Sequence, residues 1–440
     1  MVAMAEPSSA YRGTVERDDS DEQRRRRRRR AWIAVGAIAL VIAVALGSYI
    51  GVVLNAPLPK AAAVMVPIVP PATPPVAITL PETGASAVSV SGADEFAGTK
   101  GKDGVLASSG GNAARPIASI SKVITTLVIL DRKPLAADEP GPIITFTKAD
   151  HKLYDSYYVR GATIQPMDTG STMSLHDALE LMLVVSASNY AEAVSTWAFG
   201  SQANFLAAAH SWLAKNGMKG TTFVDPSGID PRNTSTPTDL LTLGRLAMAN
   251  PLVASLVGLQ TTDVPGFSGM PNTNTLLGSS DVDGIKTGTL DEAGSCLLYS
   301  ATFGVGATQP ITVTGIILGG LHHSAVAADA ATVINDIREG FHAVTLVKAD
   351  DVLGHYTTVW GERADIVAER SASLLTWSDS PITVTSHAKV VGPGKARMSV
   401  GSATFTGEGG TQTVLLVLAG TLEEPDAWWR ITHPAELFGG

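Results

Sequence analysis

The chain has 440 residues, of which 45% are hydrophobic and 17% charged, so it can build a core and is not a disordered protein. This length exceeds one ordinary domain of about 150 residues. The first thirty residues carry nine Arg and six acidic residues, whereas the other 410 carry 23 basic and 35 acidic ones. We therefore expect no nucleic-acid partner, because phosphate contacts need basic patches and these 410 residues are net acidic. The single cysteine, Cys296, cannot form an intrachain disulfide, and no metal or cofactor is expected.

The N-terminal part of the chain predicts a membrane anchor. A run of seven Arg ends at Arg30, and Ala31–Leu54 follows without a charged residue. As a helix this segment spans about 36 Å at ~1.5 Å per residue, which exceeds the ~30 Å hydrocarbon core of a bilayer. Because basic flanks stay inside, we expect 1–30 to be a cytoplasmic basic tail and 31–54 a single-pass signal-anchor helix. A cleavable signal peptide is the alternative, but its apolar stretch is normally only about 7 to 15 residues long.

A proline-rich segment, 55–79, follows the predicted anchor and contains seven prolines. This composition favours an extended polyproline conformation of ~3.1 Å per residue, or roughly 70 Å when fully stretched. We therefore expect a linker that holds the folded part of the chain above the membrane.

Segment 80–346 has the pattern of an α+β domain with an antiparallel sheet and a helical block. Short alternating runs at 85–90 and 104–107 predict strands. Ser174 and Thr236 stand where N-cap residues belong, and helical patterns cover 116–130, 175–185, 205–215 and 237–249. Strands return at 282–289, 296–303 and 310–318 with the spacing of a meander, and a closing helix runs from Val326 to Phe341.

Segment 347–440 is rich in strand-forming residues and predicts a separate small C-terminal β-rich domain. Candidate strands lie at 387–391, 397–405 and 412–422.

Ser119 and Lys122 have a spacing that suits nucleophilic catalysis. They begin and end the sequence S-I-S-K at the start of a predicted helix, so both side chains share one face. The amine could accept the hydroxyl proton if burial and neighbouring cations keep it neutral. Backbone N–H groups at the helix N-terminus could stabilise an oxyanion beside Ser119. The spacing by itself is a weak signal, because Ser386 and Lys389 repeat it in the β-rich tail without further motifs.

A second motif, Lys286-Thr287-Gly288-Thr289, lies on a predicted strand. Lys286 and Gly288 share one side of that strand because side chains alternate. Glycine at this place permits the close approach of a substrate backbone.

In this order the motifs resemble those of the serine penicillin-binding proteins, which share a fold with class A β-lactamases and use S-x-x-K, S-x-N and K-T-G elements. The version seen here is similar to that of the low-molecular-weight D-alanyl-D-alanine carboxypeptidases. The resemblance covers 84–341 and includes D-P-S-G-I-D at 225–230 and N-T-N-T-L-L at 272–277. It implies a penicillin-binding, transpeptidase-like α+β domain.

The resemblance also implies a role for each motif residue. Ser119 would attack the carbonyl of the penultimate D-Ala, Lys122 would act as base, and the backbone N–H groups of Ser119 and Thr289 would form the oxyanion hole. Lys286, Thr287 and Thr289 would hold the terminal carboxylate of the substrate. β-Lactam antibiotics would then be covalent inhibitors.

The second element departs from the family pattern. Ser186-Ala187-Ser188-Asn189 occupies the expected loop, but Ser188 stands where S-x-N has Asn. By resemblance Ser186 would relay a proton to the leaving amine. For substrate binding two options stay open: Ser188 works through water, or the loop shifts so that Asn189 points inward.

The leading hypothesis is therefore a membrane-anchored serine D-alanyl-D-alanine carboxypeptidase that removes the terminal D-Ala from peptidoglycan stem peptides in a bacterial cell wall. We expect its catalytic domain outside the cytoplasmic membrane. A catalytically impaired penicillin-binding-like scaffold is the non-enzyme alternative, motivated by Ser188. A β-lactamase is less favoured because Glu192 is poorly placed to activate the deacylating water. A D,D-endopeptidase differs only in the acyl acceptor side of its substrate.

Overall fold

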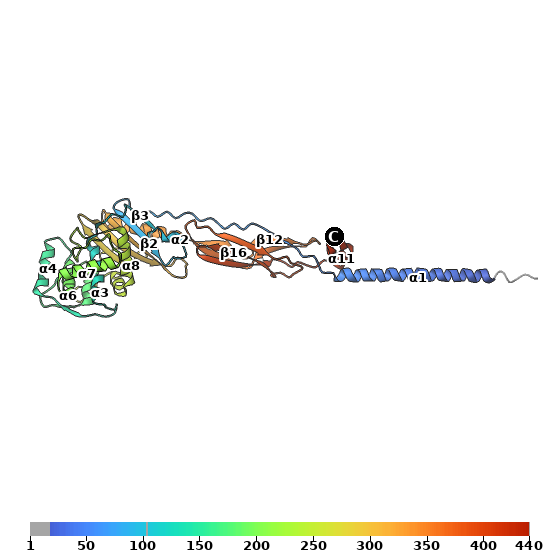
Figure 1. Ribbon diagram of the computed structural model, residues 1–440, viewed down its shortest axis with the longest axis horizontal. Helices are drawn as coiled ribbons and strands as arrows, with labels where there is room; N and C mark the ends of the chain where they lie inside the picture. The colour runs from blue at the N-terminus through green and yellow to red at the C-terminus, as the bar shows by residue number, and fades with distance from the viewer. Residues whose placement is uncertain (1–17, 103, 440) are drawn as a thin grey trace, which may run out of the picture.

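The computed structural model describes residues 18–439 except residue 103. The molecule is elongated, with a mixed α/β domain at one end, a β-rich domain in the middle and the N-terminal helix at the other end (Figure 1). The predicted cytoplasmic tail lies outside the described residues as far as residue 17. Its remaining residues, 18–30, continue the N-terminal helix.

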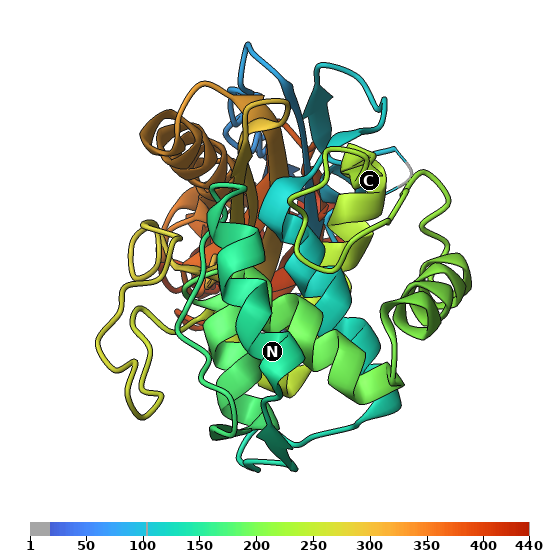
Figure 2. The same cartoon turned by 90° about the vertical axis from the view of Figure 1, so that its left-hand side faces the viewer.

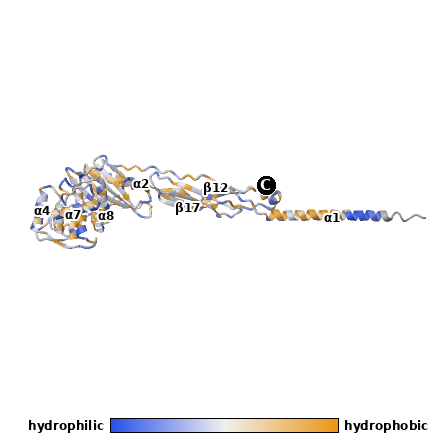
Figure 3. Ribbon diagram, in the orientation of Figure 1, coloured by the Kyte–Doolittle hydropathy of each residue, from blue (hydrophilic) through white to orange (hydrophobic). Residues whose placement is uncertain are grey.

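Helix α1 (Asp18–Asn55) is long and apolar enough to cross a membrane. Its apolar part adjoins the β-rich domain, and its arginine-rich part lies at the far end (Figure 3). Apolar side chains along it are exposed, such as Leu40 at 65% and Val41 at 66%. A helix of this length with exposed apolar side chains is more stable in lipid than in water, because water disfavours apolar surface. Lipid tolerates its backbone because the backbone groups are paired within the helix. The chain thus carries an N-terminal helix of the kind that anchors proteins in membranes.

The proline-rich segment 55–79 differs from the expected free linker. Within it, strand β1 (Ala63–Met65) pairs antiparallel with β12 (Val352–Thr357). Further along, the N–H of Val76 donates to Ser378 Oγ at 3.0 Å. The segment runs alongside the β-rich domain (Figure 1). It docks there because the edge strand β12 offers unpaired backbone groups that an extended chain can satisfy.

A five-stranded antiparallel sheet forms the centre of the α/β domain, in the order β3-β2-β10-β9-β8. Its strands are β2 (Ala85–Ser91), β3 (Ala107–Ser109), β8 (Val282–Leu290), β9 (Gly294–Phe303) and β10 (Ile311–Gly320). The predicted meander of the last three strands is confirmed. The strand predicted at 104–107 is wrong except for its last residue, because Lys102 and Val105 pair with each other and turn the chain before β3 begins.

Helices cover both faces of this sheet. Helix α10 (His323–Glu339) buries Val326, Val333 and Ile337 against one face. The helical block covers the other face and lies in front of the strands in Figure 2. It consists of α3 (Ser121–Arg132), α4 (Lys148–Tyr158), α5 (Leu175–Leu183), α6 (Ser188–Phe199), α7 (Gln202–Lys215), α8 (Pro237–Ala249) and α9 (Pro251–Val257). Short elements connect them: α2 (Ala97–Lys100), β4 (Arg115–Pro116), β5 (Ile143–Thr145), β6 (Thr172–Ser174) and β7 (Thr234–Ser235).

Local signals explain where two of these helices begin. Ser174 Oγ accepts the N–H of Asp177, and Thr236 Oγ1 accepts the N–H of Asp239, both at 3.1 Å. Each bond satisfies a backbone donor that the first turn of a helix leaves unpaired. The predicted N-caps are therefore confirmed, and α5 and α8 begin where the sequence places them.

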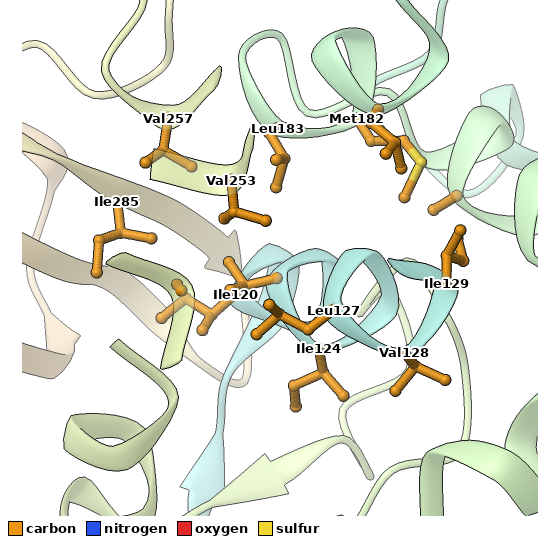
Figure 4. Close-up of a cluster of buried hydrophobic side chains, with 14 of the residues drawn as sticks. Ile120, Ile124, Leu127, Val128, Ile129, Met182, Leu183, Val253, Val257 and Ile285 are labelled. Carbon is orange, nitrogen blue, oxygen red and sulfur yellow. The ribbon is translucent and has the colours of Figure 1, made fainter. Parts of the chain in front are cut away.

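Helix α3 lies at the centre of the helical block and positions the residues before it. Apolar side chains surround it on more than one side: Leu183 of α5 and Val253 of α9 lie on one side of α3, and its own Ile124 and Val128 point to the other (Figure 4). Burial of each such side chain stabilises the fold by about 1.5 to 3 kcal/mol. This packing holds the N-terminal end of α3 next to β8.

The β-rich domain contains a six-stranded antiparallel sheet in the order β1-β12-β13-β17-β16-β15, and a two-stranded ribbon packs on it. Its other strands are β11 (Phe341–Val347), β13 (Arg363–Ala368), β14 (Ala372–Trp377), β15 (Thr383–Ala388), β16 (Ser399–Gly407) and β17 (Gly410–Leu418). The predicted β-rich region is present. Strand β11 of the ribbon begins at Phe341, whose ring packs on Trp377 of β14 with centroids 4.7 Å apart.

Two short helices end the chain beside the anchor: α11 (Ala427–Thr432) and α12 (Pro434–Phe438). Tyr49 Oη of α1 donates to the carbonyl of Ile431 at 2.7 Å, and Arg430 Nη1 donates to the carbonyl of Leu54 at 3.1 Å. These contacts place the β-rich domain at the end of α1, as Figure 1 shows.

Candidate active site

Ser119 lies in a short 3-10 turn, Ala118–Ile120, directly before α3. The neighbouring Ile117 and Ile120 are fully buried and fix this turn in the core. Lys122 Nζ lies 2.9 Å from Ser119 Oγ. The predicted pair is therefore brought together, with the amine in position to accept the hydroxyl proton.

The loop 225–233 holds Lys122 from the other side. Lys122 Nζ donates to the carbonyl of Ser227 at 2.8 Å. The loop is rigid because the carboxylate of Asp225 accepts the backbone N–H groups of Ser227 at 2.7 Å and Gly228 at 3.0 Å. Asn233 Nδ2 in turn donates to Ser121 Oγ at 2.9 Å and ties the loop to the first turn of α3. The sequence motif at 225–230 thus has a structural explanation: it presents the Ser227 carbonyl to the amine of Lys122.

The charge state of Lys122 follows from its burial. Its side chain is completely buried, and this desolvation lowers the pKa of the amine from 10.5 to about 7, although the Asp225 carboxylate opposes the shift. Near neutral pH a large fraction of Lys122 is consequently uncharged. A neutral amine 2.9 Å from a serine hydroxyl is the chemical requirement for general-base activation.

We expect Asp225→Asn to shift the pH dependence of acylation. The carboxylate raises the pKa of Lys122, so its removal lowers that pKa below about 7 and leaves the amine neutral at more acidic pH. The acidic limb of the rate of acylation by a penicillin should therefore move to lower pH, and stopped-flow kinetics across that limb would measure it. Asp230→Asn, on the same loop but paired with Arg232, should not move the limb. An unchanged or raised midpoint in Asp225→Asn would contradict this expectation.

The K-T-G motif lies on β8, the edge strand beside the Ser119 turn. A Cβ atom on Gly288 would approach the backbone nitrogen of Ser119 and the Cβ of Ala118 to 3.0 Å. Glycine is therefore needed for this close approach, which brings the end of β8 next to the nucleophile. The backbone N–H groups of Ser119 and Thr289, expected to form an oxyanion hole, belong to these two adjoining segments.

Thr273 connects the K-T-G strand to the loop before it, a role that is not evident from the catalytic motifs. Lys286 Nζ donates to Thr273 Oγ1 at 3.1 Å, and Thr287 Oγ1 lies 2.6 Å from the same oxygen. Lys286 is 1% exposed, and burial together with the charge of Lys122 holds the pKa of its amine well below the usual range. The N-T-N-T pattern at 272–275 was the available signal for this partner.

The second element lies between α5 and α6. Ser186 is buried and has a positive φ of 66°, an uncommon conformation for a residue with a side chain. Its hydroxyl makes no hydrogen bond with Lys122 within the described part of the chain. Ser188 is the first residue of α6, and its backbone N–H donates to the carbonyl of Thr163 at 2.8 Å.

The structure does not support the expectation that Asn189 points toward the substrate. Its side-chain amide donates to the carbonyl of Gln165 at 2.8 Å, and its Oδ1 accepts the N–H of Gln165 at 3.1 Å. Asn189 is also fully buried. The Nδ2 and Oδ1 groups of Asn189 thus hold the loop after α4. They pair with the backbone carbonyl and N–H of Gln165, which are buried and need hydrogen-bond partners. Ser188 remains the candidate at this position.

Two solved structures with the same fold are penicillin-binding proteins. Penicillin binding protein 5 from Haemophilus influenzae superposes with a TM-score of 0.52 at 17% identity, covering 81% of this chain and all of that one. Penicillin binding protein 6B from Escherichia coli gives a TM-score of 0.53 at 19% identity, covering 77% and 96%. The chain therefore has the fold of the penicillin-binding proteins, including the β-rich domain.

Residues 98–314, just under half of the chain, match the sequence family described as D-alanyl-D-alanine carboxypeptidase. A D-alanyl-D-alanine endopeptidase from Pseudomonas aeruginosa is 31% identical over 194 residues, which are 42% of this chain and 59% of that protein. The D-alanyl-D-alanine carboxypeptidase DacC from Escherichia coli is 26% identical over 263 residues, 58% of this chain and 64% of that protein. The chain thus covers about 60% of the length of these curated relatives.

Proposed function

We propose that this protein is a membrane-anchored serine D-alanyl-D-alanine carboxypeptidase that removes the terminal D-Ala from peptidoglycan stem peptides. The observation that carries the proposal is the contact of Lys122 Nζ with Ser119 Oγ at 2.9 Å, with the amine buried and its pKa lowered to about 7. The match of residues 98–314 to the D-alanyl-D-alanine carboxypeptidase family supports the same reaction.

In the acylation step Ser119 Oγ bonds to the carbonyl carbon of the penultimate D-Ala while Lys122 takes the hydroxyl proton. The backbone N–H groups of Ser119 and Thr289 stabilise the oxyanion that forms. The C–N bond then breaks, and the amine of the terminal D-Ala receives the proton, relayed through Ser186. Lys286, Thr287 and Thr289 hold the terminal carboxylate beside Gly288, and Ser188 contacts the substrate backbone.

In the second step water attacks the ester on Ser119. Lys122 accepts a proton of that water and returns it to Ser119 Oγ as the ester bond breaks, and the shortened peptide leaves as a carboxylic acid that ionises in solution. β-Lactams acylate Ser119 in the same manner and act as covalent inhibitors.

The charge pattern of the chain supports its orientation in the membrane. Seven Arg precede the apolar part of α1, so the N-terminus lies in the cytoplasm and both folded domains lie outside, where peptidoglycan is found. The protein spans the membrane once in this arrangement.

Labelling with a fluorescent penicillin tests the proposal. We expect the full-length protein in detergent to gain one penicillin mass and Ser119→Ala to gain none. Ser386→Ala is the matched control, because Ser386 and Lys389 repeat the S-x-x-K spacing on and just beyond the edge strand β15. It should label like the wild type. The labelling of this variant should be unaffected because Ser386 belongs to the β-rich domain, whereas the K-T-G strand belongs to the α/β domain.

Other outcomes of this experiment favour the alternatives. A folded protein that neither labels nor consumes the drug would support a scaffold. Rapid drug consumption without a stable adduct would support a β-lactamase. With labelling established, release of D-Ala from a linear peptide or cleavage of a cross-linked dimer separates the carboxypeptidase from the endopeptidase that the relative from Pseudomonas aeruginosa is named for.

A further inference from the structure

The first turn of helix α6 is bound to segment 163–166, which follows α4. The N–H of Ser188 donates to the carbonyl of Thr163 at 2.8 Å. Two residues later along the helix, the hydroxyl of Tyr190 donates to the carbonyl of Pro166, also at 2.8 Å. These contacts fix the position of the N-terminal end of α6.

Asn189 makes the central contact of this set. Its side chain is completely buried and pairs with Gln165 as a neighbouring backbone would: Nδ2 donates to the carbonyl at 2.8 Å, and Oδ1 accepts the N–H at 3.1 Å. Gln165 is buried as well, so water does not readily replace these bonds. A side chain that lacks either the donor or the acceptor would leave a buried backbone group unpaired, whereas a carboxamide supplies both.

Ser186 lies just before this turn and has an uncommon backbone conformation. Its φ is +66°, a region that a residue with a side chain occupies only where the surrounding contacts hold it there. The backbone next to it is fixed, because the N–H of Ala187 donates to the carbonyl of Leu181 at 3.0 Å. Among residues 18–439 apart from residue 103, no group hydrogen-bonds to the Ser186 hydroxyl, so this hydroxyl is available to a ligand.

We propose that Asn189 is a positioning residue of the reaction: by binding segment 163–166 it keeps Ser186 in the conformation that delivers a proton to the leaving amine. This inference rests on the proposed function, because it needs Ser186 as the proton relay. Without the two bonds to Gln165, the first turn of α6 can move. Ser186 then relaxes to an ordinary negative φ, which turns its hydroxyl away from the leaving nitrogen.

The proton balance of C–N cleavage shows which substrates depend on this position. The nitrogen leaves as a neutral amine only if it gains a proton as the bond breaks. Ser186 gives its hydroxyl proton to that nitrogen and receives one from the ammonium of Lys122. A sulfur leaving group needs no such proton, because thiols ionise at mildly basic pH and depart as thiolates. Misplacement of Ser186 therefore slows the cleavage of amides more than that of thioesters.

The kcat/KM of the full-length protein in detergent, measured with two substrates, tests the inference. One substrate is a short N-acylated peptide ending in D-Ala-D-Ala, and the other is its thioester analogue, in which D-thiolactate replaces the terminal D-Ala. We expect Asn189→Leu to lower kcat/KM for the amide about 10-fold or more and that for the thioester by less than about 3-fold. Ser186→Ala should lower kcat/KM for the amide by about 100-fold with the same preference for the thioester, because it removes the relay itself. A general distortion of the site would slow both substrates equally.

Asn216→Leu is the matched control, because it removes the same kind of bond elsewhere. Asn216 Nδ2 donates to the carbonyl of Trp212 at 2.8 Å, at the end of α7. The adjacent Lys215 pairs with Asp131, which lies at the opposite end of α3 from Ser119. This variant should keep the wild-type ratio of amide to thioester kcat/KM.

Tyr190→Phe is a milder second variant of the same contact. It removes the bond to Pro166 and leaves the ring packed between Phe146 and Phe267. We expect it to lower the ratio of amide to thioester kcat/KM roughly 3-fold, the effect of about one lost hydrogen bond. If Asn189→Leu does not fold, this ratio decides the question.

The outcomes separate the inference from the proposed function. If Ser186→Ala lowers the ratio of amide to thioester kcat/KM while Asn189→Leu and Tyr190→Phe leave it at the wild-type value, the inference is wrong and the proposed function stands. If Ser186→Ala leaves the ratio unchanged, the relay through Ser186 is wrong and the inference fails with it. If Ser119 is never acylated by either substrate, the proposed function itself fails.

Discussion

Lys122→Met is expected to slow acylation of Ser119 strongly and to raise the free energy of unfolding at neutral pH. Removal of the base should slow the reaction with a penicillin by on the order of 10² to 10⁴. Stability should rise because the wild type holds this side chain completely buried, at a pKa of about 7 rather than 10.5. Folding at pH 7 therefore releases a proton at a cost on the order of 4 kcal/mol, which Met does not incur.

The sign of the pH dependence makes this prediction specific. Between pH 7 and 10.5 the unfolded state binds more protons than the folded state, so the stability of the wild type rises with pH in that window. The advantage of Lys122→Met should therefore be fully present at acidic pH, fall as pH rises through 7, and disappear near pH 10.5. Loss of the hydrogen bond to the Ser227 carbonyl reduces the gain by about 1 to 3 kcal/mol.

Thermal unfolding at several pH values, together with penicillin labelling, would measure both effects. Lys152→Met removes a charge from the exposed surface of α4 and should change neither quantity. A Lys122→Met protein that labels at the wild-type rate, or that is less stable than the wild type at pH 7, would refute the assignment of a neutral buried base.

Gly228→Ala is expected to cause the largest loss of stability among the substitutions considered. Gly228 has a φ of +79°, and a Cβ there would lie 1.9 Å from the carbonyl oxygen of Ala118 and 2.7 Å from Ser121 Oγ. The clash falls on the turn that carries Ser119, so the nucleophile must move. We expect destabilisation above about 4 kcal/mol, the range of the most severe point substitutions, and a matching loss of acylation.

Gly217→Ala separates the two causes of that effect. Gly217 has nearly the same φ, +73°, but no atom lies within 4 Å of a Cβ built on it. It should therefore lose only about 1 to 2 kcal/mol for its left-handed backbone, with acylation intact. Chemical denaturation and the penicillin acylation rate would be compared for both variants. Equal losses of stability in the two would show that steric contact with the Ser119 turn is unimportant.

Elements with strong local signals were predictable from the sequence. The starts of the helices after Ser174 and Thr236 were predictable because an N-cap side chain and the N–H that it accepts are only three residues apart. The pairing of Ser119 with Lys122 is equally local, since one helical turn brings i and i+3 together. The order of the motifs then identified the family, although no single motif would have done so.

Tertiary structure decided the contacts between segments that are distant in the chain. Lys122 meets the Ser227 carbonyl across 105 positions, and Thr289 meets His323 across 34. The sequence allowed Asn189 to face either the substrate or the loop after α4. In the structure its side chain faces the loop, where it makes two hydrogen bonds to the backbone of Gln165. The proline-rich segment docked because an edge strand offered it partners, which its own composition does not reveal. Propensity, capping and periodicity act over a few residues, whereas burial, the pKa values and the hydrogen-bond partners at the site depend on which surfaces the folded chain brings together.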